Sequence, residues 1–201
     1  MTRSLTHLPL AVALLGASCS TPFPRPGPGE KAGDAWVYYN RGEALFDDIV
    51  ATDPINGDYD KAIAEFNRAI RLKPDYVEAY HARGFVYYIA GNHARAIEDY
   101  GEAIRLNPKN ALSYILRGWA YESEHQFEIA IKDYNWLIDL YPEYGPAWCY
   151  RGRAYKHLGN EGMAEADMEK ARKLGFQCRT EPEQPEIWLS GQWDGDPYII
   201  G

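Results

Sequence analysis

The 201-residue sequence lacks the features of nucleic-acid-binding, membrane-spanning and catalytic proteins. Its 29 Asp and Glu outnumber 21 Lys and Arg, and the net charge of −8 would repel a phosphate backbone, so we expect no nucleic-acid partner. The apolar run at residues 8–15 is too short to cross a bilayer as a helix. There is no Gly-rich phosphate loop, His-Glu-x-x-His or Gly-x-Ser-x-Gly motif, so we expect neither an enzyme nor a bound cofactor.

Residues 1–19 have the pattern of an export signal. Arg3 supplies a positive start, an apolar run follows, and small residues precede Cys19. Small residues before a cysteine resemble the lipobox of bacterial lipoproteins, whose signal is cut before a cysteine that carries the lipids. Gly16 departs from that pattern, which usually has leucine there. We predict a signal peptide with Cys19 lipidated, and the alternative is an ordinary secretory signal.

Residues 20–34 form a linker rich in proline and glycine, which predicts a semi-extended spacer. A lipid anchor, a spacer and a folded domain would place the chain at the bacterial cell envelope. By this resemblance it is lipid-anchored, at the outer membrane and facing the periplasm, and touches the membrane only through its anchor. The alternative is a soluble secreted or periplasmic protein.

A period of 34 residues organises the middle of the chain. Ala62, Ala96, Ala130 and Ala164 follow it without exception. A fixed period of this size predicts a solenoid, in which each repeat buries its apolar face by stacking on the next. Residues 35–178 divide into four repeats: 35–76, 77–110, 111–144 and 145–178. The first repeat is longer by eight residues, and we expect its first helix to be extended and to end before Pro54. The insertion either belongs to a face used for binding or is a tolerated surface loop.

The repeats resemble the tetratricopeptide repeat family. The second repeat has the family's spacing of aromatic, small and proline residues, at Tyr80, Gly84, Tyr87, Ala96, Tyr100, Ala103 and Pro108. The resemblance implies an all-α fold: a right-handed solenoid of four antiparallel helix pairs, A and B, coiled into a superhelix. Glu165 and Arg172 replace the isoleucines of earlier B helices, so the last repeat should act as a cap.

Each repeat also has an Arg-Gly pair in helix A, followed by an acid in helix B. Asp99, Asp133 and Asp167 lie sixteen residues after Arg83, Arg117 and Arg151, and Glu65 takes that place for Arg41. We interpret these as structural ion pairs between helices, because guanidinium and carboxylate groups pair well. The alternative is a row of arginines that contacts a ligand.

The resemblance further implies that a second face of helix A lines a concave groove for a partner peptide. Its predicted residues, which do not repeat between repeats, are Tyr39, Glu43, Phe46, His81, Phe85, Tyr88, Ile115, Trp119, Glu122, Cys149, Arg153 and Lys156. We therefore predict a protein-binding scaffold or adaptor of the cell envelope. The alternative is a self-association module that forms homo-oligomers, with the groove filled by its own or a neighbour's tail.

Three further expectations concern cysteines, metals and the C-terminal tail. Cys149 and Cys178 would both face an oxidising compartment, where a disulfide between them is one outcome. Glu122 and His125 are too few ligands for a metal site. Residues 179–201 are acidic and aromatic, and could occupy the groove, dock a partner or form a loose tail.

Overall fold

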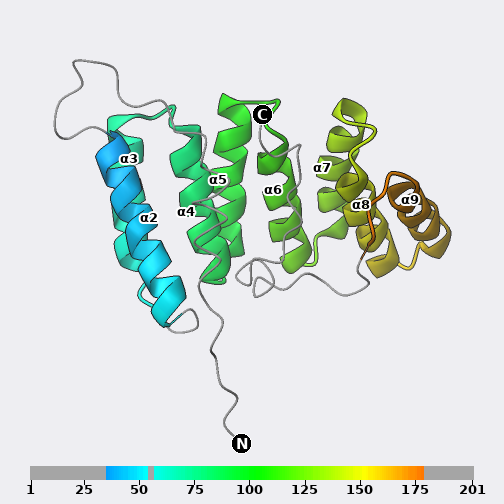
Figure 1. Ribbon diagram of the computed structural model, residues 1–201, viewed down its shortest axis with the longest axis horizontal. Helices are drawn as coiled ribbons and strands as arrows, with labels where there is room; N and C mark the ends of the chain where they lie inside the picture. The colour runs from blue at the N-terminus through cyan, green and yellow to red at the C-terminus, as the bar shows by residue number, and fades with distance from the viewer. Residues whose placement is uncertain (1–34, 54–56, 179–201) are drawn as a thin grey trace, which may run out of the picture. The chain divides into compact units, whose positions relative to one another are not determined.

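The computed structural model describes residues 35–53 and 57–178 (Figure 1). The predicted signal peptide, the lipidated Cys19, the 20–34 linker and the 179–201 tail lie outside the described residues. Within them the chain forms two compact units, with the division between Ala90 and Gly91.

Both units are built from α-helices, which confirms the predicted all-α fold class. The first unit contains α2 (Ala35–Thr52), α3 (Asp60–Leu72) and α4 (Val77–Ile89). The second contains α5 (His93–Leu106), α6 (Ala111–Ser123), α7 (Phe127–Leu140), α8 (Gly145–His157) and α9 (Glu161–Lys173). None of these helices is sufficiently long and apolar to span a membrane.

Close contact between α2 and α3 forms the core of the first unit (Figure 1). Gly42 of α2 lies directly against Phe66 of α3, and a Cβ atom at this glycine would come within 2.7 Å of the phenyl ring. Tyr39 also packs against Phe66, with ring centroids 5.8 Å apart. The small residue therefore lets two helices approach until their aromatic side chains fill the space between them.

The extra residues of the first repeat extend α2, as predicted. This helix has 18 residues, against 13 in α4, and it ends at Thr52, just before Pro54. The extension is packed, because Val50 is only 3% exposed and Phe46 lies 6.2 Å from the ring of Tyr59. The insertion thus enlarges the core of the first unit.

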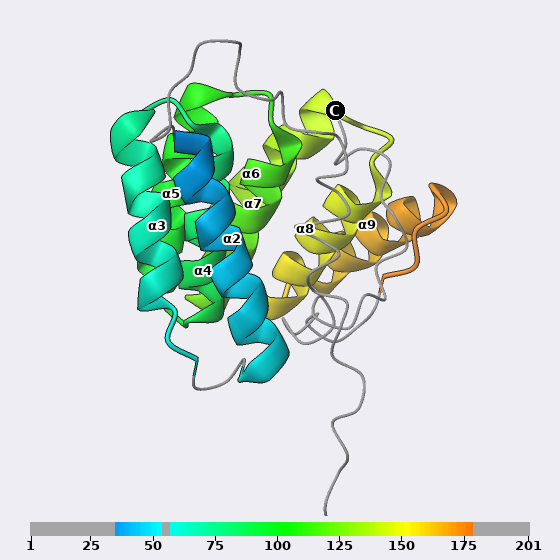
Figure 2. The same ribbon diagram turned by 60° about the vertical axis from the view of Figure 1, so that its left-hand side comes forward.

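In the second unit α6 pairs with α7, and α8 pairs with α9, as both views show (Figures 1 and 2). A Cβ atom at Gly118 would lie 2.5 Å from the ring of Tyr134, which is fully buried. At Gly152 the same atom would lie 3.1 Å from the carbonyl oxygen of Ala164. The helices of both pairs therefore approach each other closely at these glycines.

The arginines of the second unit tie helix A to helix B. Arg117 donates two hydrogen bonds to Asp133, at 2.9 and 2.6 Å, and Arg151 donates two to Asp167, at 2.7 and 2.8 Å. These pairs confirm the structural interpretation. Bidentate geometry and partial burial hold the guanidinium groups in the framework, away from a ligand role.

The pairing predicted between Arg41 and Glu65 is wrong. Arg41 is exposed, and Glu65 instead accepts a hydrogen bond of 2.6 Å from Arg68. Arg68 lies three residues after Glu65 on α3. Side chains at this spacing are neighbours on the surface of one helix, so their bond does not depend on the position of a second helix. The eight-residue insertion breaks the sixteen-residue spacing on which the prediction depended.

Two further recurrent links were missed by the sequence analysis. Arg83 and Arg151 also donate to Asn67 and Asn135, which lie sixteen residues earlier in the chain. The first aromatic residue of helix A donates to a proline carbonyl six residues before it, in the pairs Tyr80–Pro74, Tyr114–Pro108 and Trp148–Pro142. These bonds connect helix A of a repeat to helix B of the preceding repeat, or to the turn that follows it.

The turn before helix B requires a left-handed backbone. Gly91 and Gly159 adopt φ angles of 75° and 74°, and His125, at the corresponding place in the third repeat, adopts 57°. At the end of the array, Glu165 and Arg172 of α9 are exposed to solvent. Their exposure agrees with the prediction that this helix closes the array.

Candidate functional site

The first-unit part of the predicted groove contains side chains from α2 and α4. Tyr39 and Phe46 are each 2% exposed and belong to the core, so the prediction that they contact a partner needs correction. Phe46 packs edge-on against Phe85, with ring centroids 5.8 Å apart. The partly exposed residues that remain form what we call the unit-1 face: Glu43, His81, Phe85 and Tyr88.

Glu43 is the acidic group of the unit-1 face. Its Oε1 accepts a hydrogen bond of 2.7 Å from the hydroxyl of Tyr39. Burial raises the pKa of Glu43 to about 7; the Tyr39 bond opposes this shift and nearby Asp47 adds to it. Near neutral pH the carboxyl is therefore only partly ionised, and the groove is less acidic here than the sequence suggested.

His81 adds a neutral polar group to the same face. Burial lowers the pKa of His81 to about 4, so its imidazole is uncharged at neutral pH. It lies one helical turn before Phe85 on α4, and Tyr88 follows on the next turn. The unit-1 face therefore offers aromatic surface and neutral hydrogen-bonding groups.

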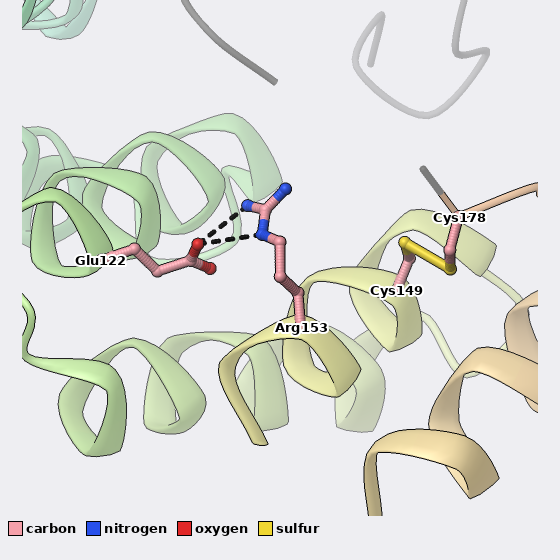
Figure 3. Close-up of a disulfide and its surroundings, with 4 residues drawn as sticks. All are labelled: Glu122, Cys149, Arg153 and Cys178. Atoms are coloured by element: carbon pink, nitrogen blue, oxygen red, sulfur yellow. Dashed lines mark hydrogen bonds and ion pairs between the residues drawn. A yellow bond between two sulfur atoms is a disulfide. The ribbon is translucent and has the colours of Figure 1, made fainter. Parts of the chain in front are cut away.

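In the second unit a buried ion pair connects α6 and α8. Arg153 donates to Glu122 Oε2 through Nε at 3.0 Å, and its Nη2 lies 2.9 Å from the same oxygen (Figure 3). The hydroxyl of Tyr134 donates to the other carboxylate oxygen at 2.7 Å. The guanidinium also lies over the ring of Tyr150. Arg153 is therefore neutralised, and the exposed positive charge among the predicted groove residues of this unit lies on Lys156.

Glu122 and Arg153 are both predicted groove residues, but their pairing is not predicted by the sequence. They lie 31 residues apart on successive A helices, so the sixteen-residue rule for pairs between A and B could not find them. A signal was available, because opposite charges lie about one helical turn apart on the same predicted face of neighbouring A helices. We define the unit-2 face by the predicted groove residues of α6 and α8: Ile115, Trp119, Glu122, Cys149, Arg153 and Lys156.

The apolar members of the unit-2 face have little exposed surface. Ile115 is 0% exposed, and Trp119 is 9% exposed and packs edge-on against Tyr150, with ring centroids 5.4 Å apart. Ile115 therefore belongs to the core like Tyr39 and Phe46, and the prediction that it contacts a partner needs the same correction. Truncation of Trp119 would also cost stability, because removal of a buried aromatic leaves a cavity.

A disulfide lies beside this face. Cys149 of α8 is bonded to Cys178, with the two Cα atoms 5.6 Å apart (Figure 3). Within residues 35–53 and 57–178, no group of three or more His, Cys, Asp or Glu side chains is arranged to hold a metal ion. The chemistry of the site is therefore that of aromatic contacts, hydrogen bonds and one exposed cation.

Comparisons with known families agree with the repeats. A model described as TPR repeat matches residues 55–91, and two described as tetratricopeptide repeat match residues 77–110 and 115–177. No curated protein matches the chain.

Solved structures show the same fold. The crystal structure of MamA is 24% identical, with a TM-score of 0.63 over 71% of this chain and 79% of that one. A MamA RS-1 double mutant is 23% identical, with a TM-score of 0.62 over 72% and 77%. The first TPR of Spaghetti (RPAP3) bound to the HSP90 peptide SRMEEVD is 23% identical, with a TM-score of 0.55 over 66% and 99%. At these identities the likeness establishes the fold alone.

The raised pKa of Glu43 predicts a pH-dependent contribution to stability. Native Glu43 holds its proton up to about pH 7, whereas the unfolded chain releases it near 4.5, so the free energy of unfolding falls as pH rises between those values. Glu43→Gln should remove this fall and stabilise the protein at pH 8 by on the order of 1–3 kcal/mol. Urea unfolding of both proteins across this pH range measures the effect. The control is Asp48→Asn, at an exposed acid of the same helix; an equal fall in wild type and Glu43→Gln would contradict the assignment.

Proposed function

We propose that this chain, which belongs to the tetratricopeptide repeat proteins, is an adaptor that binds a peptide segment of a partner protein. Proteins of this fold are protein–protein interaction modules. One observation carries the proposal: framework contacts such as Arg117–Asp133 and Arg151–Asp167 recur, whereas the helix-A faces differ from repeat to repeat. A surface fitted to one ligand would vary in this way. The structurally similar RPAP3 repeat is described as bound to a peptide, which supports a ligand of this class.

The unit-1 face indicates the chemistry of the partner segment. Phe85 and Tyr88 offer partly exposed aromatic surface, and side chains of this type commonly provide most of the binding energy at interfaces. His81 is neutral and Glu43 only partly ionised, so they favour hydrogen bonds over strong charge pairing. A segment with apolar side chains and neutral polar groups would fit this face better than a strongly basic one.

We further propose that the adaptor acts at a bacterial cell envelope, anchored by lipids on Cys19. The support is the pattern of the first 19 residues, with its positive start, apolar run and small residues before the cysteine. An anchor would hold the binding faces near envelope partners through the proline-rich spacer. We assign no catalytic reaction to the chain.

The binding proposal predicts that surface changes on the two faces weaken capture of partners. Tyr88→Ala with Lys156→Ala removes one partly exposed aromatic and one exposed cation, and should reduce the captured amount of a specific envelope protein at least tenfold. The full-length protein is used as bait in envelope extract, with quantitative mass spectrometry as the readout. Leu72→Ala with Lys132→Ala is the matched control, because both residues are exposed on B helices.

Circular dichroism of the same proteins should show unchanged helical content. Equal capture by the two double variants would contradict the proposed binding faces. Capture of nothing except further copies of the chain would favour self-association instead.

The anchoring proposal predicts that Cys19→Ser releases the protein from membranes. Expressed in a bacterial host, the wild type should sediment with the membrane fraction and incorporate labelled palmitate. The serine variant should do neither, because its hydroxyl cannot serve as the lipidated thiol. A wild-type protein that stays soluble, or a variant that still sediments, would contradict lipid anchoring.

A further inference from the structure

The described chain ends at a position that is fixed on α8. Helix α9 ends at Lys173, and Phe176 packs so closely on Gly145 that a Cβ atom at this glycine would lie 2.7 Å from the Cβ of Phe176. Two residues later, Cys178 is bonded to Cys149. The point from which residues 179–201 continue is therefore held to α8 by packing and by a covalent bond.

This point lies on the side of α8 that carries the unit-2 face. Cys149 precedes Arg153 by four residues, one turn of the helix, and Figure 3 shows both side chains leaving α8 on the same side. Arg153 reaches from there to Glu122 of α6. The disulfide thus directs the chain beyond Cys178 toward the face predicted to bind a partner.

The unit-2 face has little exposed apolar surface. Ile115 is 0% exposed, and Trp119 and Arg153 are each 9% exposed. In the tetratricopeptide repeat family, which the repeats resemble, this side of helix A lines the groove. Lys156, near the end of α8, is the exposed member of this face.

We propose that residues 179–201 bind in cis along the unit-2 face, with the Cys149–Cys178 bond as their tether, so that a partner must displace them. This inference rests on the proposed binding function and adds its regulation. The occupant is a segment of the same chain, and its position next to the site makes it a built-in competitor.

The sequence of this segment suits the face. Trp188, Trp193, Tyr198 and Ile199 supply apolar side chains for the surface around Trp119. Five acids against one arginine give the segment a net negative charge, and Lys156 and His157 are exposed near the end of α8. The acidic residues of the segment would lie near Lys156 and His157, and its aromatic side chains would lie near Trp119. These two contacts would set the direction in which the segment lies along the face.

The tether makes even a weak contact effective. Trp188 lies ten residues after Cys178 and can reach about 33 Å from it, whereas packed helices are only about 10 Å apart. A short flexible tether of this kind produces an effective concentration in the range of about 1 mM. The segment would therefore occupy the face without high intrinsic affinity.

Photo-crosslinking of the full-length protein tests the proposal without any partner. A benzoylphenylalanine at position 188 is irradiated in an equal mixture of chains with light and heavy isotopes, and crosslinked peptides are identified by mass spectrometry. The expected crosslinks join position 188 to α6 or α8 within one chain. Cys149→Ser with Cys178→Ser should lower their yield at least threefold, because the start of the segment is then no longer held to α8.

The same probe at position 163, on exposed Met163 of α9, is the control and should not reach α6. Crosslinks between light and heavy chains would overturn the proposal in favour of a second copy. Crosslinks only to other helices, or none, would overturn it outright, and an unchanged yield in the serine variant would overturn the role of the tether. Circular dichroism establishes that this variant is folded. No partner takes part, so the result is independent of whether the adaptor function holds.

Discussion

The close approach of paired helices at a glycine is the constraint on which the rest of this structure depends. At Gly42 and Gly118 there is no room for a Cβ atom, because a ring from the facing helix fills the space. Glycine inside a helix costs about 1 kcal/mol relative to alanine. Burial of an aromatic side chain offsets that cost and sets the distance between the helices. In the second unit the ring so placed belongs to Tyr134, whose hydroxyl binds Glu122, and Glu122 in turn holds Arg153. The packing of the helix pair therefore leads, through Tyr134 and Glu122, to neutralisation of Arg153 on the unit-2 face.

Features that repeat could be predicted from the sequence. The alanine period locates the B helices, and the spacing between Arg117 and Asp133 predicts their ion pair, because both depend only on local geometry copied from repeat to repeat. The eight extra residues of the first repeat likewise predict the longer α2. The sixteen-residue spacing fails to predict the partner of Glu65, because the insertion breaks that spacing between Arg41 and Glu65. Arg68, in the same helix, is the better partner.

The candidate site was harder to predict, because its properties arise from contacts that do not repeat. From the sequence alone Glu43 and Arg153 would carry full charges, but burial leaves the first only partly ionised and Glu122 neutralises the second. Tyr39 and Phe46 have the spacing of the groove but lie in the core, since Tyr39 packs on Phe66 and Tyr76 and Phe46 packs on Tyr59. The resulting faces are more aromatic and less charged than the sequence indicates. Shape and hydrogen bonding would then contribute more to specificity than charge does.

The central claim, that glycine is needed for helix approach, can be measured at two positions of the second unit. Gly118→Ala adds a methyl group 2.5 Å from the buried ring of Tyr134, whereas Gly101→Ala, in the middle of α5, adds one whose nearest neighbour is 3.9 Å away. Urea unfolding should show Gly118→Ala destabilised by about 1–3 kcal/mol through overpacking. Gly101→Ala should instead be stabilised by up to about 1 kcal/mol through helix propensity. If Gly118→Ala were as stable as Gly101→Ala, the close approach would not be the constraint that organises this fold.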